Sequence, residues 1–198
     1  MGLTLDYICG QTPLEEEEKE GLKIASVSTK AELDEFEQNN IEEAVTWLYG
    51  RKLKAEKILT MDFICELHKQ MFGRVWKWAG RFRTTEKNLG VRAYEIPVAL
   101  RMLLDDTRYW LEKGTYPPDE IAIRFKHRIV SIHCFPNGNG RHSRLMADVL
   151  VEKIFGLPVF SWGATPLYAQ RDPRKIYINA VRQADRGHWA PLMDFARW

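Results

Sequence analysis

The chain has 198 residues, and 45% of them are hydrophobic, which is enough for one well-packed domain. Its 29 basic and 27 acidic residues nearly cancel, so no general charge excess favours nucleic acid or an anionic membrane. The three cysteines are odd in number and lack Cys-x-x-Cys spacing, which argues against a disulfide framework or a zinc site. Residues 1–10 lack the features of a signal peptide, and no apolar run of about 18 residues occurs, so we expect a cytoplasmic protein.

Helical periodicity dominates the chain after an irregular start. In residues 1–27 the acidic run Glu15 to Glu18 predicts a solvated face or a loop. Two apolar stripes then predict helices that end near Gly50 and Gly73 and bury one face each. The stripes consist of Phe36, Ile41, Ala44, Val45 and Leu48, and of Leu59, Phe63, Ile64, Leu67 and Met71.

The helical period is lost between residues 81 and 93. The β-branched Thr84, Thr85 and Val91 flank the turn-forming sequence Lys-Asn-Leu-Gly at 87–90. This pattern predicts a short β-hairpin, which on these residues alone is an ordinary surface feature.

Proline marks the start of four later helical segments. Start signals followed by apolar stripes or a short helical segment occur at Pro97, Pro118, Pro173 and Pro191. No repeat or low-complexity linker divides the chain. We therefore expect one compact, mainly helical domain of the all-α class.

Residues 133–144 read His-Cys-Phe-Pro-Asn-Gly-Asn-Gly-Arg-His-Ser-Arg. Gly138 and Gly140 allow positive φ, so that successive N–H groups can surround an anion. The apolar period of residues 142–155 predicts a helix whose N-terminus also favours negative charge. Arg141 and Arg144 lie three residues apart and offer guanidiniums suited to phosphate oxygens. The segment therefore predicts a polyphosphate site.

His133 precedes this turn, and its imidazole could take a proton from an attacking hydroxyl. A single histidine or one Gly-Asn-Gly turn is more often structural, but their conjunction favours a functional site. We interpret Cys134 as a structural neighbour and not as a nucleophile. The other histidines are interpreted as surface or capping residues; they are His68, His127, His142 and His188.

The segment resembles the signature of the Fic (Fic/Doc) family, His-x-Phe-x-Asp/Glu-Gly-Asn-Gly-Arg-x-x-Arg. The matching positions are His133, Phe135, Gly138, Asn139, Gly140, Arg141 and Arg144. Asn137 departs from the pattern, because the family has a carboxylate there. Residues 67–83 resemble the family's upstream block, and Tyr177, Ala180 and Asp185 resemble its final helix. The resemblance covers most of residues 55–197.

This resemblance implies a Fic-type helical core over residues 55–198, with a β-hairpin flap over the active site. Residues 1–54 are then an N-terminal extension with an inhibitory helix. Parts of residues 10–41 are similar to the subgroup called mobile mystery protein B, which occurs on bacterial mobile elements.

The resemblance implies a protein adenylyltransferase that transfers AMP from ATP to a Ser, Thr or Tyr hydroxyl of a target protein. His133 is the implied general base, and it forms the implied catalytic group with Arg141 and Asn139. The implied phosphate-binding residues are Gly138, Asn139, Gly140, Arg141 and Arg144. The flap residues expected to contact the target are Thr84, Thr85, Leu89, Gly90 and Val91. Phe135 is expected to anchor the loop by burying its ring.

Asn137 bears on the cofactor, because the family's carboxylate binds Mg²⁺ and an amide offers only a neutral oxygen. Two alternatives follow: Mg²⁺ is held mainly by the triphosphate, which we favour, or the chain performs a variant reaction. For regulation, a family pattern in which a glutamate pairs with the second motif arginine points to Glu37, with Glu32 as a partial alternative. A surface glutamate is the competing interpretation of Glu37.

Other activities stay open. Within the superfamily these are a Doc-like phosphotransferase, disfavoured by Gly140 where that branch has lysine, and transfer of UMP or phosphocholine. A non-enzymatic alternative is a nucleic-acid-binding module. Its contact residues would be Arg171, Arg174, Lys175, Arg182 and Arg186. We expect no membrane partner, and a homodimer is left open.

Overall fold

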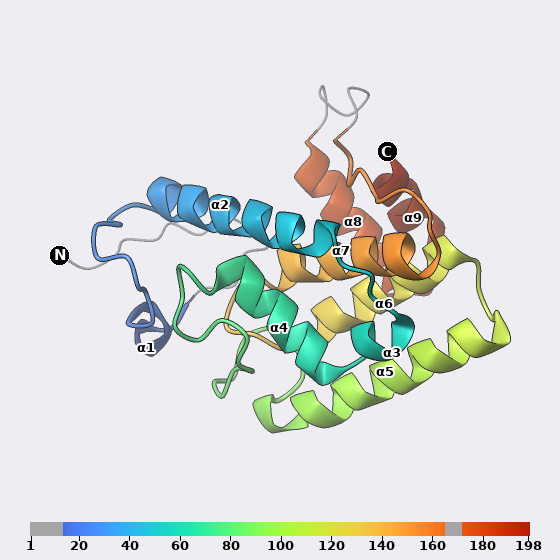
Figure 1. Ribbon diagram of the computed structural model, residues 1–198, viewed down its shortest axis with the longest axis horizontal. Helices are drawn as coiled ribbons and strands as arrows, with labels where there is room; N and C mark the ends of the chain where they lie inside the picture. Colours follow the sequence, from blue (N-terminus) through green and yellow to red (C-terminus); the bar gives the residue numbers. More distant parts are fainter. Residues whose placement is uncertain (1–13, 165–171) are drawn as a thin grey trace.

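The computed structural model describes residues 14–164 and 172–198, which are mainly helical and contain no β-strand. The expected helical class is therefore confirmed (Figure 1). The α-helices are α1 (Glu16–Lys19), α2 (Lys30–Tyr49), α3 (Ala55–Ile58), α4 (Met61–Phe72), α5 (Ile96–Lys113), α6 (Pro118–Ile132), α7 (Asn139–Val149), α8 (Pro173–Ala184) and α9 (Ala190–Arg197). A 3₁₀ turn, η1 (Ala93–Glu95), precedes α5, and a π-helical turn, η2 (Leu150–Ile154), continues α7.

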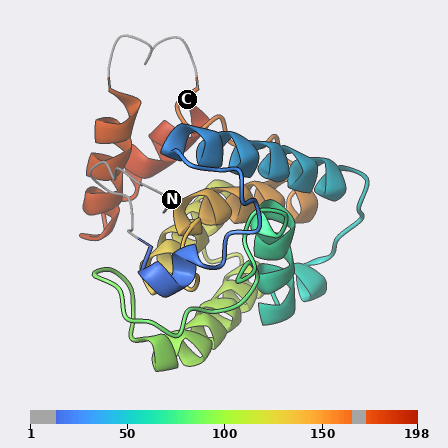
Figure 2. The ribbon, with the colours of Figure 1, turned by 90° about the vertical axis from the view of Figure 1, so that its left-hand side faces the viewer.

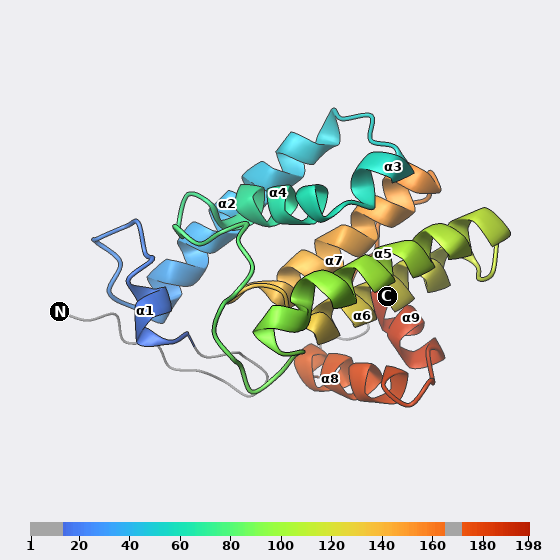
Figure 3. The ribbon, with the colours of Figure 1, turned by 90° about the horizontal axis from the view of Figure 1, so that it is seen from below.

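Helices α6 and α7 pack against each other in the middle of the fold (Figure 3). Helix α2 lies along α4, as Figures 1 and 2 show, while α5 packs on α6 and α8 pairs with α9. Large side chains that are fully enclosed fill the space between these helices; they include Phe63, Phe72, Trp76, Phe125 and Phe135. None of the helices in the described ranges has the length and apolar character needed to cross a membrane.

Local capping explains where several helices begin. Thr29 accepts a hydrogen bond from the Glu32 N–H, and the Glu32 carboxylate accepts from the Thr29 N–H, which is a capping box at the start of α2. Thr60 caps α4 with its hydroxyl alone, which accepts from the Phe63 N–H at 3.1 Å. The backbone bonds from Ser28 and Thr29 lower the pKa of the Glu32 carboxyl. Glu32, the alternative inhibitory candidate, therefore serves as a helix cap.

The expected hairpin at residues 84–91 is wrong, because this segment is an irregular loop in the structure. The physical reason is Arg83, whose buried guanidinium donates to the carbonyl of Thr85 at 2.8 Å and also to the carbonyl of Val91. A side chain thus satisfies carbonyls on both sides of the loop that a hairpin would pair with backbone N–H groups. We refer to residues 84–91 as the covering loop.

Candidate active site

The segment that joins α6 to α7, residues 133–140, is referred to here as the anion loop. Its backbone has a positive φ at the first residue, His133 (58°), and again at Gly138 (78°), which is the N-cap of α7. A Cβ on Gly138 would lie 2.6 Å from the Phe72 ring, so only glycine fits there. Gly140 does not have the expected positive φ, because it belongs to the first turn of α7. A Cβ on Gly140 would meet nothing within 4 Å, which leaves open space beside the helix N-terminus.

Asn139 closes the anion loop on itself. Its Oδ1 accepts from the Phe135 N–H at 3.0 Å, and its Nδ2 donates to the Phe135 carbonyl at 2.7 Å. Both ends of the side chain therefore bind the loop backbone, and the expected contact of this amide with a phosphate oxygen stays a prediction. The Phe135 ring is fully buried, as expected of an apolar anchor, and stacks on His68 with centroids 3.7 Å apart.

His133 lies under the covering loop. A Cβ built on Gly90 would be 2.6 Å from the His133 Cβ, and Arg83 Nε donates to the His133 carbonyl at 2.7 Å. Burial, together with the positive charges of Arg83 and Lys87, lowers the pKa of His133 to about 4. The imidazole is therefore neutral at pH 7 and able to accept a proton.

The neighbouring thiol and three other histidines are buried. Burial raises the pKa of Cys134 to about 12, which keeps this thiol protonated and unreactive, as interpreted from sequence. The interpretation of His68, His127 and His142 as surface residues is wrong, since they are 0%, 8% and 1% exposed. Only His188 among the four lies at the surface. Sequence reasoning missed the burial of His68, His127 and His142, because a histidine on an apolar helix face gives no signal of its hydrogen-bond partners.

The two motif arginines project toward different helices. Arg141 forms an ion pair with Glu37 of α2, with 2.7 Å between Nη1 and Oε2, and its guanidinium lies 4.9 Å from the Phe72 ring centre. Arg144 instead lies over the Tyr177 ring of α8 at 5.7 Å. The two guanidiniums therefore flank the first turn of α7.

Glu37 is buried, with 4% of its surface exposed, so it is not the surface glutamate of the competing interpretation. Its second oxygen, Oε1, accepts from the Trp76 Nε1–H at 2.6 Å. The expected pairing with Arg144 is wrong, because the partner in the structure is Arg141. Trp76 holds the carboxylate in place, and this contact joins α2 to the segment after α4.

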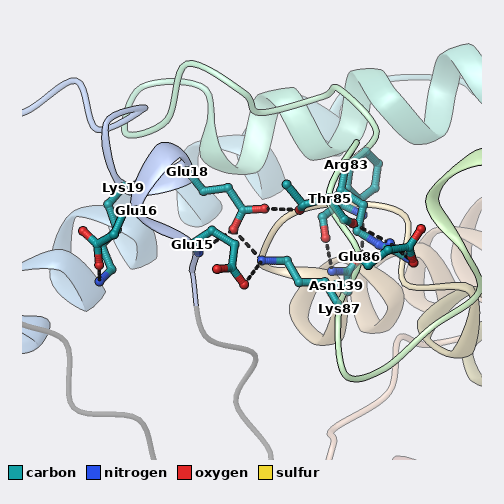
Figure 4. A network of polar contacts seen from close by, with 10 residues as sticks. Glu15, Glu16, Glu18, Lys19, Arg83, Thr85, Glu86, Lys87 and Asn139 are labelled. Atoms are coloured by element: carbon teal, nitrogen blue, oxygen red, sulfur yellow. Dashed lines mark hydrogen bonds and ion pairs between the residues drawn. The ribbon is translucent and has the colours of Figure 1, made fainter.

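An acidic contact fastens the covering loop to α1 (Figure 4). Glu18 accepts from the Thr85 hydroxyl at 2.8 Å and from the Lys87 Nζ at 2.5 Å, and Glu15 lies 3.7 Å from the same ammonium. Glu18 is 7% exposed, so the expectation of a wholly solvated acidic run is wrong at this residue. The carbonyl of Glu18 also accepts from the Trp78 indole at 3.0 Å. Helix α1 thus joins the covering loop to the segment after α4.

The residues around Asn137 do not fit a protein-held magnesium ion. The Asn137 Oδ1 accepts from the Gly138 N–H at 2.5 Å, and the Asn137 backbone carbonyl lies 3.1 Å from His68 Nε2. Within residues 14–164 and 172–198, no group of three or more His, Cys, Asp or Glu side chains is arranged to hold a metal. Asn137 thus offers two neutral oxygens here, and both already accept hydrogen bonds.

The chain is similar to a protein family and to curated proteins that carry the name of that family. Residues 58–151 match the model of the Fic/DOC family. The chain is 25% identical over 174 residues to the protein adenylyltransferase Fic of Nematostella vectensis, covering 86% of this chain and 39% of that protein. It is 28% identical over 141 residues to the protein of the same name from Drosophila grimshawi, covering 69% and 28%. The chain therefore spans well under half of these relatives.

Solved structures share the fold. Fic-1 (aa134–508) from C. elegans superposes with a TM-score of 0.65 and 24% identity, covering 90% of this chain and 50% of that one. BepC from Bartonella tribocorum, with bound AMPPNP, superposes with a TM-score of 0.67 and 16% identity, covering 92% and 97%. At these identities the likeness shows the fold alone.

Proposed function

Since residues 58–151 match the model of the Fic/DOC family, we propose that this protein is an adenylyltransferase that moves AMP from ATP to a Ser, Thr or Tyr hydroxyl of a target protein. The observation that carries the proposal is a neutral, buried His133 at one end of a loop that leads into a helix N-terminus. The open space at Gly140 and the guanidiniums of Arg141 and Arg144 supply room and charge for a triphosphate. The names of the curated relatives support the same activity.

In this reaction His133 takes the proton from the target hydroxyl as its oxygen attacks the α-phosphorus of ATP. A new phosphorus–oxygen bond forms to the target, the bond from the α-phosphorus to the bridging oxygen breaks, and pyrophosphate leaves. The first N–H groups of α7 have no acceptor inside the helix, so they are available to phosphate oxygens. Arg141 then binds the α- and β-phosphates, and Arg144 binds the γ-phosphate.

Glu37 restrains this site in the resting protein. Its carboxylate occupies Arg141, so a triphosphate must compete with a buried acid for the same guanidinium. The contact with Trp76 keeps Glu37 in that place. We therefore assign the inhibitory role to Glu37 through Arg141 and not through Arg144.

Magnesium enters the proposal only with the nucleotide. Asn137 provides no anionic oxygen, so the triphosphate itself supplies the ligands that hold the ion. No step above requires a protein-bound metal.

The covering loop is the proposed contact surface for the target protein. Leu89 is 53% exposed, and Thr84 and Gly90 are also exposed on this loop. Thr85 and Val91 are half-buried and bind other parts of the protein. A target segment would lie against Leu89 and Gly90, next to His133. The cytoplasmic location, the mobile-element origin and the homodimer stay predictions.

The decisive experiment uses ATP labelled at the α- or at the γ-phosphate, with the parent protein and His133→Ala incubated in cell lysate. Transfer of the α-label alone is expected, with a loss of about 100-fold or more in the variant. Transfer of the γ-label alone would instead identify a Doc-like phosphotransferase. Cys134→Ala is the matched control, because it removes a buried neighbour that the chemistry does not use.

A further inference from the structure

His68 lies on α4 beneath the anion loop, and both of its ring nitrogens are engaged. The Gly80 N–H donates to His68 Nδ1 at 3.1 Å, so in the neutral ring the proton is on Nε2. His68 Nε2 lies 3.1 Å from the Asn137 carbonyl and therefore donates to it. The geometry defines the tautomer of His68 and the direction of both hydrogen bonds.

The same ring supports the loop at a second point. Phe135 stacks on it with an interplanar angle of 20° and a centroid distance of 3.7 Å. His68 thus holds the side chain of Phe135 and the carbonyl of Asn137, on the two sides of Pro136.

The carbonyl contact controls the next N–H group. A peptide unit is planar and trans, so the Gly138 N–H points opposite to the Asn137 carbonyl and away from His68. That N–H donates to the Asn137 Oδ1 at 2.5 Å, at the residue that is the N-cap of α7. Rotating the peptide between Asn137 and Gly138 would break this bond and displace the N-cap, and with it the first turn of α7.

We propose that His68 is a positioning residue, whose Nε2–H holds the Asn137 carbonyl so that Gly138, the N-cap of α7, is fixed and the first turn of α7 faces the phosphates. This role of His68 rests on the proposed function only for the identity of the phosphate-containing ligand. Complete burial, with the positive charges of His142 and Arg141 nearby, lowers the pKa of His68 well below its ordinary value. The ring therefore stays neutral and keeps one donor and one acceptor.

Two amide substitutions separate the two ring nitrogens. His68→Asn places an oxygen near the Nδ1 position, which keeps the acceptor for Gly80 but does not reach Asn137. His68→Gln places an NH₂ group near the Nε2 position, which keeps the donor to Asn137. The measurement is the Kd for inorganic tripolyphosphate and for ATP by titration calorimetry, together with the Tm of each protein.

We expect His68→Asn to weaken tripolyphosphate binding about tenfold and His68→Gln to weaken it less than about threefold. His142 offers the matched control, because it is fully buried and its Nε2 lies 3.1 Å from the Ile64 carbonyl in the same core. His142→Asn should lower the Tm as much as His68→Asn does, while the Kd changes by less than about twofold.

Equal Kd values for parent, His68→Asn and His68→Gln would overturn the proposal, whatever their Tm values. If either variant fails to fold, the imidazole ¹⁵N spectrum of the parent still decides, because a proton on Nδ1 of His68 contradicts the donor role. A parent that binds neither tripolyphosphate nor ATP also overturns it. A parent that binds tripolyphosphate and shows the Asn-against-Gln difference but transfers no AMP rejects the proposed function and leaves the role of His68 standing.

Discussion

The covering loop meets the anion loop at His133, but the two loops are held in different ways. The anion loop is closed by its own residues, since Asn139 binds both backbone groups of Phe135 four positions away. The covering loop has a local tie as well, through the adjacent Arg83, but it is fastened to the rest of the protein over long range, since Glu18 binds Thr85 across 67 positions and Arg83 binds the His133 carbonyl across 50. A short-range closure forms with little loss of chain entropy, whereas a long-range one requires the rest of the fold.

This difference suggests different tasks. A phosphate site must be preorganised before its ligand arrives, and the anion loop has that property. A surface that receives a protein segment benefits from contacts that can be released, and partly exposed polar contacts such as Lys87 with Glu15 have that property. Substitutions in either loop can test this difference between the two loops.

The largest expected effect comes from Asn139→Ala, which opens the anion loop from within. It leaves the Phe135 N–H and carbonyl buried without partners, which should lower the free energy of unfolding by about 2–4 kcal/mol. We expect AMP transfer to fall by about 100-fold or more, because the phosphate donors lose their alignment. Urea unfolding and α-label transfer measure the two effects. Asn139→Asp keeps the acceptor for the Phe135 N–H but sets a carboxylate oxygen against the Phe135 carbonyl, so it should also lose stability; unchanged stability in both variants would contradict the assigned contacts.

A smaller effect is expected from Glu37→Gly, which frees Arg141. Auto-modification with α-labelled ATP should rise about tenfold, as roughly 1.4 kcal/mol of restraint is removed. Glu37→Gln keeps an acceptor for Trp76 but loses the charge, and it should show a partial rise. The matched control is Glu35→Gly, an exposed position of the same helix with the same glycine cost. Equal activity of Glu37→Gly and Glu35→Gly would show that Glu37 does not restrain the site.

The smallest effect is expected from Glu18→Gln, which loosens the covering loop without touching the anion loop. Hydrogen exchange at residues 84–91 should become faster, and the KM for the target should change by about threefold while the affinity for ATP stays constant. Glu17→Gln, at an exposed position of α1, is the control. If the affinity for ATP changed as much as the KM for the target, the two loops would not have the separate tasks assigned to them.

Much of the fold could be read from sequence because its helices carry local signals. The stripes at residues 36–48 and 59–71 and the prolines at helix starts predicted helices that the structure contains. The hairpin prediction failed because turn chemistry at residues 87–90 says nothing of Arg83, whose guanidinium occupies the interior of the loop. Gly138 was placed correctly at a positive φ, while Gly140 proved to be helical.

The sequence by itself determined the order of the motif at residues 133–144, the helix that follows it and the positive φ at Gly138, because these depend on residues a few positions apart. Only the tertiary structure decided that Glu37 pairs with Arg141, that Glu18 holds the covering loop and that His68 supports the Asn137 carbonyl. Those contacts join helices α2, α1 and α4 to segments 69 to 104 positions away. Their partners are chosen by packing, which brings distant residues within hydrogen-bond reach and leaves no mark in local spacing.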